Sequence, residues 1–185
     1  RQAILLEKGS IVTMGTSDAV ISTYMDNVSS HNEFASDRLT ADGAFHFTRV
    51  RTLNHELQPV STFAHDQSIT VEIALFAKQR PQNVHLLIAA NNKNGQRIFS
   101  SDISLEKYKI RVDDFNSFYV TIPAEILTPG NYSFFVAIHA PNALGYDVKD
   151  QICPISVFDN GSAFNQYENK WFYGDVFVHC SWVFK

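Results

Sequence analysis

Apolar and polar residues alternate in five separate stretches between residues 69 and 157. A two-residue period is typical of a β-strand that buries one face. The alternating apolar sets are Ile69, Val71, Ile73 and Leu75; Leu86, Ile88 and Ala90; Phe118, Val120 and Ile122; Tyr132, Phe134, Val136 and Ile138; and Cys153, Ile155 and Val157.

Turn-forming residues separate these stretches, for example Asn91 to Gly95 and Pro141 to Gly145. Many short strands joined by turns at this spacing predict an antiparallel β-sandwich or barrel. Since no long amphipathic helix interrupts the strands, a parallel α/β sheet is disfavoured. The sequence therefore predicts an all-β domain.

Two further segments predict less regular strands. A first strand is predicted from four apolar residues, Phe45, Phe47, Val50 and Leu53. Their two-residue period is interrupted, and we interpret this interruption as a β-bulge. A polar, aromatic connection at 159–173 leads to a predicted final strand over 174–184. Because this connection is long, the last strand can reach a second copy of the protein.

The first 26 residues predict a separate piece, a β-hairpin followed by a short helix. Residues 3–6 and 11–14 are apolar runs of strand length, and Gly9 between them is free to adopt a positive φ. Asp18 falls in the first turn of the predicted helix.

Residues 27–43 are polar, lack a sustained period and are predicted to be a linker. Residues 44–185 form the predicted β domain.

Composition narrows the functional classes. The net charge is −4 and the basic residues are scattered, which disfavours nucleic acid as a partner. No apolar stretch approaches the roughly 20 residues that span a bilayer. The two cysteines, Cys153 and Cys180, allow one disulfide or two reduced thiols, and a reducing compartment would favour the thiols.

Motifs of common enzyme classes are missing from the sequence. There is no Gly-x-x-x-x-Gly-Lys-Ser/Thr loop, no Gly-x-Ser-x-Gly elbow and no His-Glu-x-x-His. The seven histidines are isolated, and no spacing argues for a metal site. We therefore expect no catalytic residues, no metal and no cofactor, and we expect this chain not to be an enzyme.

Several segments resemble one known family. They are Val60 to Ile73 (VSTFAHDQSITVEI), Ile122–Pro123, Thr128 to Ile138 (TPGNYSFFVAI), and Gly174-Asp-Val-Phe-Val with Trp182. Together, in this order, they are similar to the C-terminal domain of Wzt-type ATP-binding subunits of O-antigen polysaccharide ABC exporters. The hairpin and helix at 3–25 resemble the end of the nucleotide-binding domain of an ABC transporter, although any hairpin and helix would give the same pattern. Gln67 departs from the family, which often has glycine there.

The resemblance implies both a fold and a function. The fold would be an immunoglobulin-like β-sandwich, and the function would be non-catalytic binding of the O-antigen polysaccharide at its modified non-reducing end. The domain would be a homodimer with exchanged C-terminal strands. It would be cytoplasmic and peripheral to the bacterial inner membrane, and the parent ATPase would join it to the membrane-embedded transporter subunit. The alternative is a structural appendage that only dimerises the ATPase subunit.

A sugar site needs an aromatic platform beside planar polar side chains. If Tyr132, Phe134, Val136 and Ile138 face the core, the opposite sheet face carries the side chains between them, with Ile152, Ser156 and Phe158 from the next strand. Small Ala89 and Ala137 would leave a depression there. The candidate carbohydrate-binding residues are His85, Asn91, Phe135 and His139 on this face, and Trp171 and Tyr173 in the connection.

Each of these candidates has a structural alternative. One alternative is that the exchanged C-terminal strand covers the same sheet face. Separately, Trp171 and Tyr173 would anchor their loop, and His85 and His139 would be satisfied histidines at the edge of the core.

Overall fold

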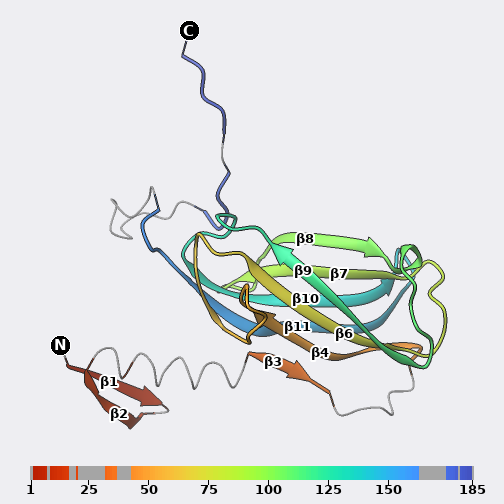
Figure 1. Ribbon diagram of the computed structural model, residues 1–185, viewed down its shortest axis with the longest axis horizontal. Coiled ribbons are helices and arrows are strands. Elements are labelled where there is room, and N and C mark those ends of the chain that lie inside the picture. Colours follow the sequence, from red (N-terminus) through yellow and green to blue (C-terminus); the bar gives the residue numbers. More distant parts are fainter. Residues whose placement is uncertain are drawn as a thin grey trace.

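Two β-sheets packed face to face make up most of this computed structural model (Figure 1). The structure describes residues 2–7, 9–16, 20, 32–36, 43–162, 174–178 and 180–184. The all-β prediction is confirmed for this part of the chain, since strands account for nearly all of its regular structure.

The first sheet has four antiparallel strands in the order β3-β4-β6-β9. Their bounds are Glu33–Ala35, Phe45–Leu53, Ile69–Ala77 and Asp114–Ile122. The pairing of β4 with β6 shifts between Phe47 and Arg49, which confirms the predicted bulge. Strand β3 lies inside the segment predicted to be a linker, where three residues are too few to show a period.

The second sheet has five strands in the order β5-β11-β10-β7-β8. Their bounds are Thr62–Ala64, Leu144–Phe158, Gly130–Ala140, His85–Asn92 and Arg97–Ser104. All neighbours are antiparallel except β5 and β11, which are parallel. A short 3₁₀ helix, Leu105–Lys107, follows β8 on the way to β9 in the other sheet.

The core lies between the two sheets and is built from the alternating residues that the sequence predicts. Phe47, Val71 and Ile73 from one sheet meet Phe134 and Ile138 from the other, and all five side chains are almost fully buried. Burying large apolar side chains on facing sheets is the main stabilising contribution in such a fold. The inward faces of β6, β7 and β10 are therefore predicted correctly.

Strand β11 departs from simple alternation. Gln151 and Cys153 both have positive φ angles, 52° and 50°, and the register with β10 shifts around Phe134. Each irregularity changes which face the next side chain occupies. As a result Ile152 packs against the core, and its predicted place on the opposite face is wrong.

The N-terminal piece contains the predicted hairpin. Strand β1, Gln2–Glu7, pairs with β2, Ser10–Thr16, and Gly9 has the expected positive φ of 82°. Of the predicted helix, Val20 is helical, and the rest lies outside the described residues apart from Thr16, which ends β2. Ile4, Leu6 and Met14 are exposed, so the hairpin presents an apolar surface.

The described residues of the predicted final strand, 174–178 and 180–184, form no strand in this structure. Among the described residues of 174–184, only Val176 makes an isolated bridge, with Leu127. Hydrogen bonds from Thr128 to Asp175 and from Phe177 to Ile126 fix the start of this segment. Beyond them the chain leaves the sheets (Figure 1), and Trp182 is 93% exposed. The described residues 180–184 pair with no strand of this chain, although the outer edges of β8 and β9 have no strand neighbour among the described residues.

Both cysteines are free, Cys153 buried and Cys180 exposed. Burial raises the pKa of the Cys153 thiol to about 11, and its Sγ lies 3.1 Å from the carbonyl oxygen of Val50. Since the thiolate is the reactive form, such a thiol reacts slowly with alkylating agents.

Thiol labelling checks this assignment. In a Cys180→Ser variant, iodoacetamide at pH 8 is expected to leave Cys153 unlabelled over hours, because a pKa of about 11 leaves about one thiol in a thousand ionised. Adding denaturant should then label it within minutes. Rapid labelling of the folded variant would contradict the burial.

Candidate functional site

The outward face of the five-stranded sheet gathers most of the residues predicted to bind carbohydrate. We call it the β10 face. Register pairs His139 with His85 and Phe135 with Ala89 on adjacent strands β10 and β7. Because Phe134, Val136 and Ile138 point into the core, Phe135 and His139 point away from it. The sequence-based placement of these side chains on one face is consistent with this register.

Two histidines on the β10 face share one carboxylate. Asp102 lies on β8, and its Oδ1 is 2.5 Å from His85 Nδ1 while its Oδ2 is 2.9 Å from His139 Nε2. Asp102 thus links three strands, since β7 lies between β8 and β10. Both imidazoles are about one quarter exposed, so each keeps an accessible edge.

Asp102 is ionised more readily than an ordinary aspartate. Partial burial raises the pKa of its carboxyl group, but the hydrogen bonds and charges of His85 and His139 outweigh burial and lower the pKa overall. The carboxylate of Asp102 therefore stays ionised between the two imidazoles at neutral pH.

Phe135 supplies an aromatic ring four residues from His139. The guanidinium carbon of Arg97 lies 3.9 Å from the centroid of this ring, a cation–π contact. Arg97 comes from β8, where it pairs in register with Asn91. At about 3.3 Å per residue, Phe135 and His139 are about 13 Å apart along β10. The β10 face thus has a donor-rich end at Arg97 and an imidazole end.

The other predicted site residues contribute less. Asn91 is 2% exposed, and its Nδ2 donates to Asp150 Oδ1 over 2.9 Å, so it offers little surface to a ligand. Ala89 and Ala137 are also buried on this face. Trp171 and Tyr173 lie outside the described residues.

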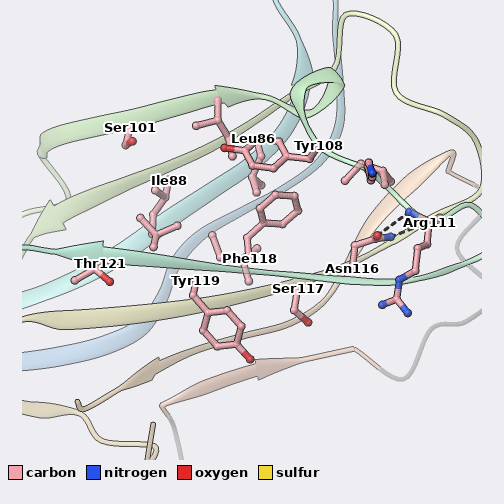
Figure 2. A pocket seen from close by; sticks show the side chains of 15 residues that line it. Leu86, Ile88, Ser101, Tyr108, Arg111, Asn116, Ser117, Phe118, Tyr119 and Thr121 are labelled. Carbon is pink, nitrogen blue, oxygen red and sulfur yellow. Dashed lines mark hydrogen bonds between the residues drawn. The ribbon is translucent and has the colours of Figure 1, made fainter. Parts of the chain in front are cut away.

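A cleft of about 750 Å³ opens elsewhere, between the edge strands β8 and β9 (Figure 2). We call it the edge cleft. Its floor is aliphatic, with Ile73, Leu86 and Ile88 from the core. Polar side chains line its rim, among them Ser101 and Thr121. Neither β8 nor β9 has a second strand neighbour among the described residues, so the cleft lies between two free strand edges.

Aromatic residues form one end of the edge cleft. The rings of Tyr108 and Phe118 meet edge to face, with centroids 5.4 Å apart. The loop beside them is held by Asn116, whose Oδ1 accepts from the Arg111 amide at 2.9 Å and whose Nδ2 donates to the Arg111 carbonyl at 3.0 Å (Figure 2). The cleft is therefore shaped in advance.

Sequence reasoning missed Asp102, because it did not recognise β8 as a strand. In the segment Arg97–Ser104 Ile98 and Phe99 are adjacent and the pairing shifts at Asn91, so no clean alternation remains. The turn at 91–95 could have revealed this strand, because a tight turn after one strand predicts an antiparallel strand after it. Pairing that second strand with β7 places Asp102 beside Leu87.

The described residues include no group of three or more histidine, cysteine or acidic side chains arranged to hold a metal ion. Within the same residues, no helix has the length and hydropathy required to cross a membrane.

Comparison with known proteins gives the family. Residues 37–169 match the model of the Wzt C-terminal domain. The crystal structure of the C-terminal domain of Wzt is similar over 83% of this chain and 87% of its own length, with a TM-score of 0.60 and 12% sequence identity. A glycoside hydrolase family 2 β-glucuronidase matches 65% of this chain and 12% of its own, with a TM-score of 0.42 and 16% identity, too little to support an argument.

No curated protein matched the chain. The solved Wzt domain shows a shared fold, and the family model covers well over half of the sequence, including all of β4 to β11. The chain therefore belongs to the Wzt C-terminal domain family, an appendage of the ATPase subunit that is associated with O-antigen ABC exporters.

Proposed function

We propose that this domain binds O-antigen polysaccharide without altering it, at the modified non-reducing end, and so selects cargo for export. The observation that carries the proposal is the β10 face, where an aromatic ring, a guanidinium group and two imidazoles lie on one sheet surface. Sugars present flat apolar faces and hydroxyl groups, and this combination of side chains suits both.

The β10 face suits a sugar better than the edge cleft does. The edge cleft also has aromatic and polar side chains, but they surround an aliphatic floor of Ile73, Leu86 and Ile88, where sugar hydroxyls would find no polar partner. On the β10 face, Arg97 offers hydrogen-bond donors beside Phe135, and the imidazoles offer further polar atoms at the other end.

Several further assignments belong to this proposal. We assign the two sheets to the immunoglobulin-like class, with support from their mostly antiparallel strands and shared core. The exposed apolar residues of the β1–β2 hairpin fit a piece that packs against an ABC nucleotide-binding domain. The domain would then work in the cytoplasm beside the inner membrane, where the parent ATPase contacts the membrane-embedded subunit.

Binding is tested by calorimetric titration of the 185-residue chain with O-antigen purified from the source strain. Phe135→Ala is expected to weaken binding about tenfold, since an aromatic contact of this kind contributes about 1.4 kcal/mol. His139→Ala should also weaken it, by removing one polar contact. Circular dichroism confirms that each variant is folded.

The matched control is Phe115→Ala, because Phe115 is an exposed phenylalanine on β9 of the other sheet, away from the β10 face. It should bind like the parent protein. An unrelated glycan should bind to none of the proteins. If the parent protein ignores its own O-antigen, glycan selection is wrong; if both variants bind normally, the β10 face is the wrong place.

The second candidate function, dimerisation of the ATPase subunit, is favoured by the C-terminal segment. Val178, Trp182 and Phe184 are spaced by even numbers of residues, so an extended chain would present them on one face, and all three are exposed. We propose that this segment adds a strand in the edge cleft of a second copy, where two free strand edges flank an aliphatic floor. Dimerisation and glycan binding would then use different surfaces.

A further inference from the structure

The shared carboxylate of Asp102 fixes what the two imidazoles can offer to a ligand. Each carboxylate oxygen receives one imidazole nitrogen, at 2.5 Å from His85 Nδ1 and 2.9 Å from His139 Nε2. We propose that Asp102 is a positioning residue that holds both histidines as hydrogen-bond acceptors for the hydroxyl groups of an uncharged sugar unit. This inference rests on the glycan-binding function proposed above.

The chemistry of the carboxylate determines the tautomers. An ionised carboxylate only accepts hydrogen bonds, so the nitrogen facing it must carry a proton. In neutral His85 the proton is therefore on Nδ1, and Nε2 has a free lone pair. In neutral His139 the proton is on Nε2, and Nδ1 has the free lone pair. The two rings present different nitrogens, but both present an acceptor.

Asp102 stays ionised at neutral pH, which keeps this arrangement in place. Burial raises the pKa of its carboxyl group, but the hydrogen bonds and charges of His85 and His139 lower the pKa overall. No arginine or lysine among the described residues forms an ion pair with Asp102, whose salt-bridge partners are the two histidines. The imidazole end thus carries a net negative charge when both rings are neutral.

The negative charge of Asp102 and the two acceptor nitrogens determine which class of sugar unit can bind at His85 and His139. When both rings are neutral, hydroxyl groups donate to the free imidazole nitrogens, whereas a carboxylate, sulfate or phosphate would be repelled by Asp102 and would find no N–H donor on the free nitrogens. Arg97 at the other end of the β10 face has the opposite preference. The face therefore gives a bound chain a direction, with an uncharged, hydroxyl-rich unit at His85 and His139.

A purely structural role for Asp102 makes different predictions. Because Asp102 on β8 links to His139 on β10 across β7, it also ties an edge strand to the sheet. If Asp102 were only a structural link, its loss would lower the stability of the fold but would not change the glycan affinity through the imidazole tautomers. Imidazole tautomers and glycan affinity must therefore be measured beside stability.

The test is Asp102→Asn, followed by side-chain ¹⁵N NMR of the histidines at pH 8, where imidazoles in general are neutral. The parent protein should show the Nδ1–H tautomer for His85 and the Nε2–H tautomer for His139. Asparagine offers one acceptor and one donor, so one ring must change tautomer or turn away. The affinity for oligosaccharides prepared from the source strain's O-antigen should fall about five- to tenfold, because the variant loses one hydrogen bond to the sugar.

Ser101→Ala is the matched control, because Ser101 is adjacent to Asp102 on the same strand but lies on the opposite face, in the edge cleft. It should change neither the tautomers nor the affinity. In the parent protein, adding the oligosaccharides should shift His85 Nε2 and His139 Nδ1, and adding the same oligosaccharides oxidised to carry carboxylates should shift them less.

The outcomes separate this inference from the function on which it rests. If the parent protein binds no O-antigen, the proposed function fails. If the parent binds, and Asp102→Asn changes a tautomer while affinity stays the same, the positioning role is wrong. Should the variant not fold, the parent spectrum decides, because the opposite tautomer at either histidine overturns the inference.

Discussion

Replacing Glu72 with alanine is expected to lower the free energy of unfolding by about 2–3 kcal/mol, a large fraction of the stability of a domain of this size. Glu72 lies on the outward face of β6 and is 2% exposed. Its Oε1 is 2.9 Å from Arg49 Nη2, its Oε2 is 2.5 Å from Arg51 Nε, and Tyr119 donates to Oε1 over 3.3 Å.

The size of this effect follows from what the substitution leaves behind. Without Glu72, two guanidinium groups from β4 face each other with no carboxylate between them. Breaking a buried ion pair costs about 3–5 kcal/mol, but Arg49 and Arg51 are 40% and 26% exposed, and water reduces that cost.

Urea denaturation followed by fluorescence measures the change. Glu56→Ala is the control, since Glu56 is 68% exposed in a turn and its removal should change stability by less than about 0.5 kcal/mol. If Glu72→Ala is as stable as the Glu56 variant, the ion cluster contributes nothing.

The same cluster makes stability depend on pH. Burial raises the pKa of Glu72, but the hydrogen bonds and charges of Arg49 and Arg51 lower it overall, below the ordinary value of 4.5. A group whose pKa is lower in the folded state contributes stability above its unfolded pKa and loses it as the pH falls through the folded pKa. Stability should therefore drop below about pH 4.5, and less steeply in Glu72→Gln than in the parent protein.

The strands that the sequence predicts well are those with one face in the core. In β6 and β10 every second residue is buried between the sheets, so the alternation is visible in the sequence. Strand β5 has three residues and β8 lies at an edge, and neither needs a regular apolar face. Packing against neighbours places these strands, and that information is spread over distant parts of the chain.

The candidate site divides in the same way. His85, Phe135 and His139 could be placed on one face because two well-predicted strands carry them. Asp102 could not, since its position depends on the register of β8, and Ile152 was misplaced by irregular backbone at Gln151 and Cys153. Local alternation thus predicts which residues share a face, whereas bulges and edge strands decide which of them meet.

The sequence predicts a strand in the C-terminal segment, but the described residues of the segment form no strand within a single chain. The segment's exposed apolar residues indicate that it needs a partner surface. An extended segment that carries Trp182 and Phe184 on one face needs a sheet edge and an apolar surface. Both are present in the edge cleft, where Ile73, Leu86 and Ile88 form the floor. The pattern is therefore consistent with a strand that completes a neighbouring molecule.

Replacing both Trp182 and Phe184 with serine is expected to convert a dimer into a monomer. Two buried aromatic anchors contribute about 2 kcal/mol each or more, so the dissociation constant should rise about a thousandfold. The fold of the domain should remain, because the start of the segment keeps its hydrogen bonds from Thr128 to Asp175 and from Phe177 to Ile126. Analytical ultracentrifugation across a range of concentrations measures the change.

The receiving surface is tested by a matched pair on β8. Ser101→Lys places a charge in the edge cleft and should also produce a monomer, whereas Ser100→Lys places it on the opposite face of the same strand and should leave the dimer intact. A dimer that survives in the Trp182 and Phe184 variant would rule out strand exchange. A monomeric Ser100→Lys variant with a dimeric Ser101→Lys variant would move the interface to the β10 face, where the C-terminal strand would compete directly with the glycan.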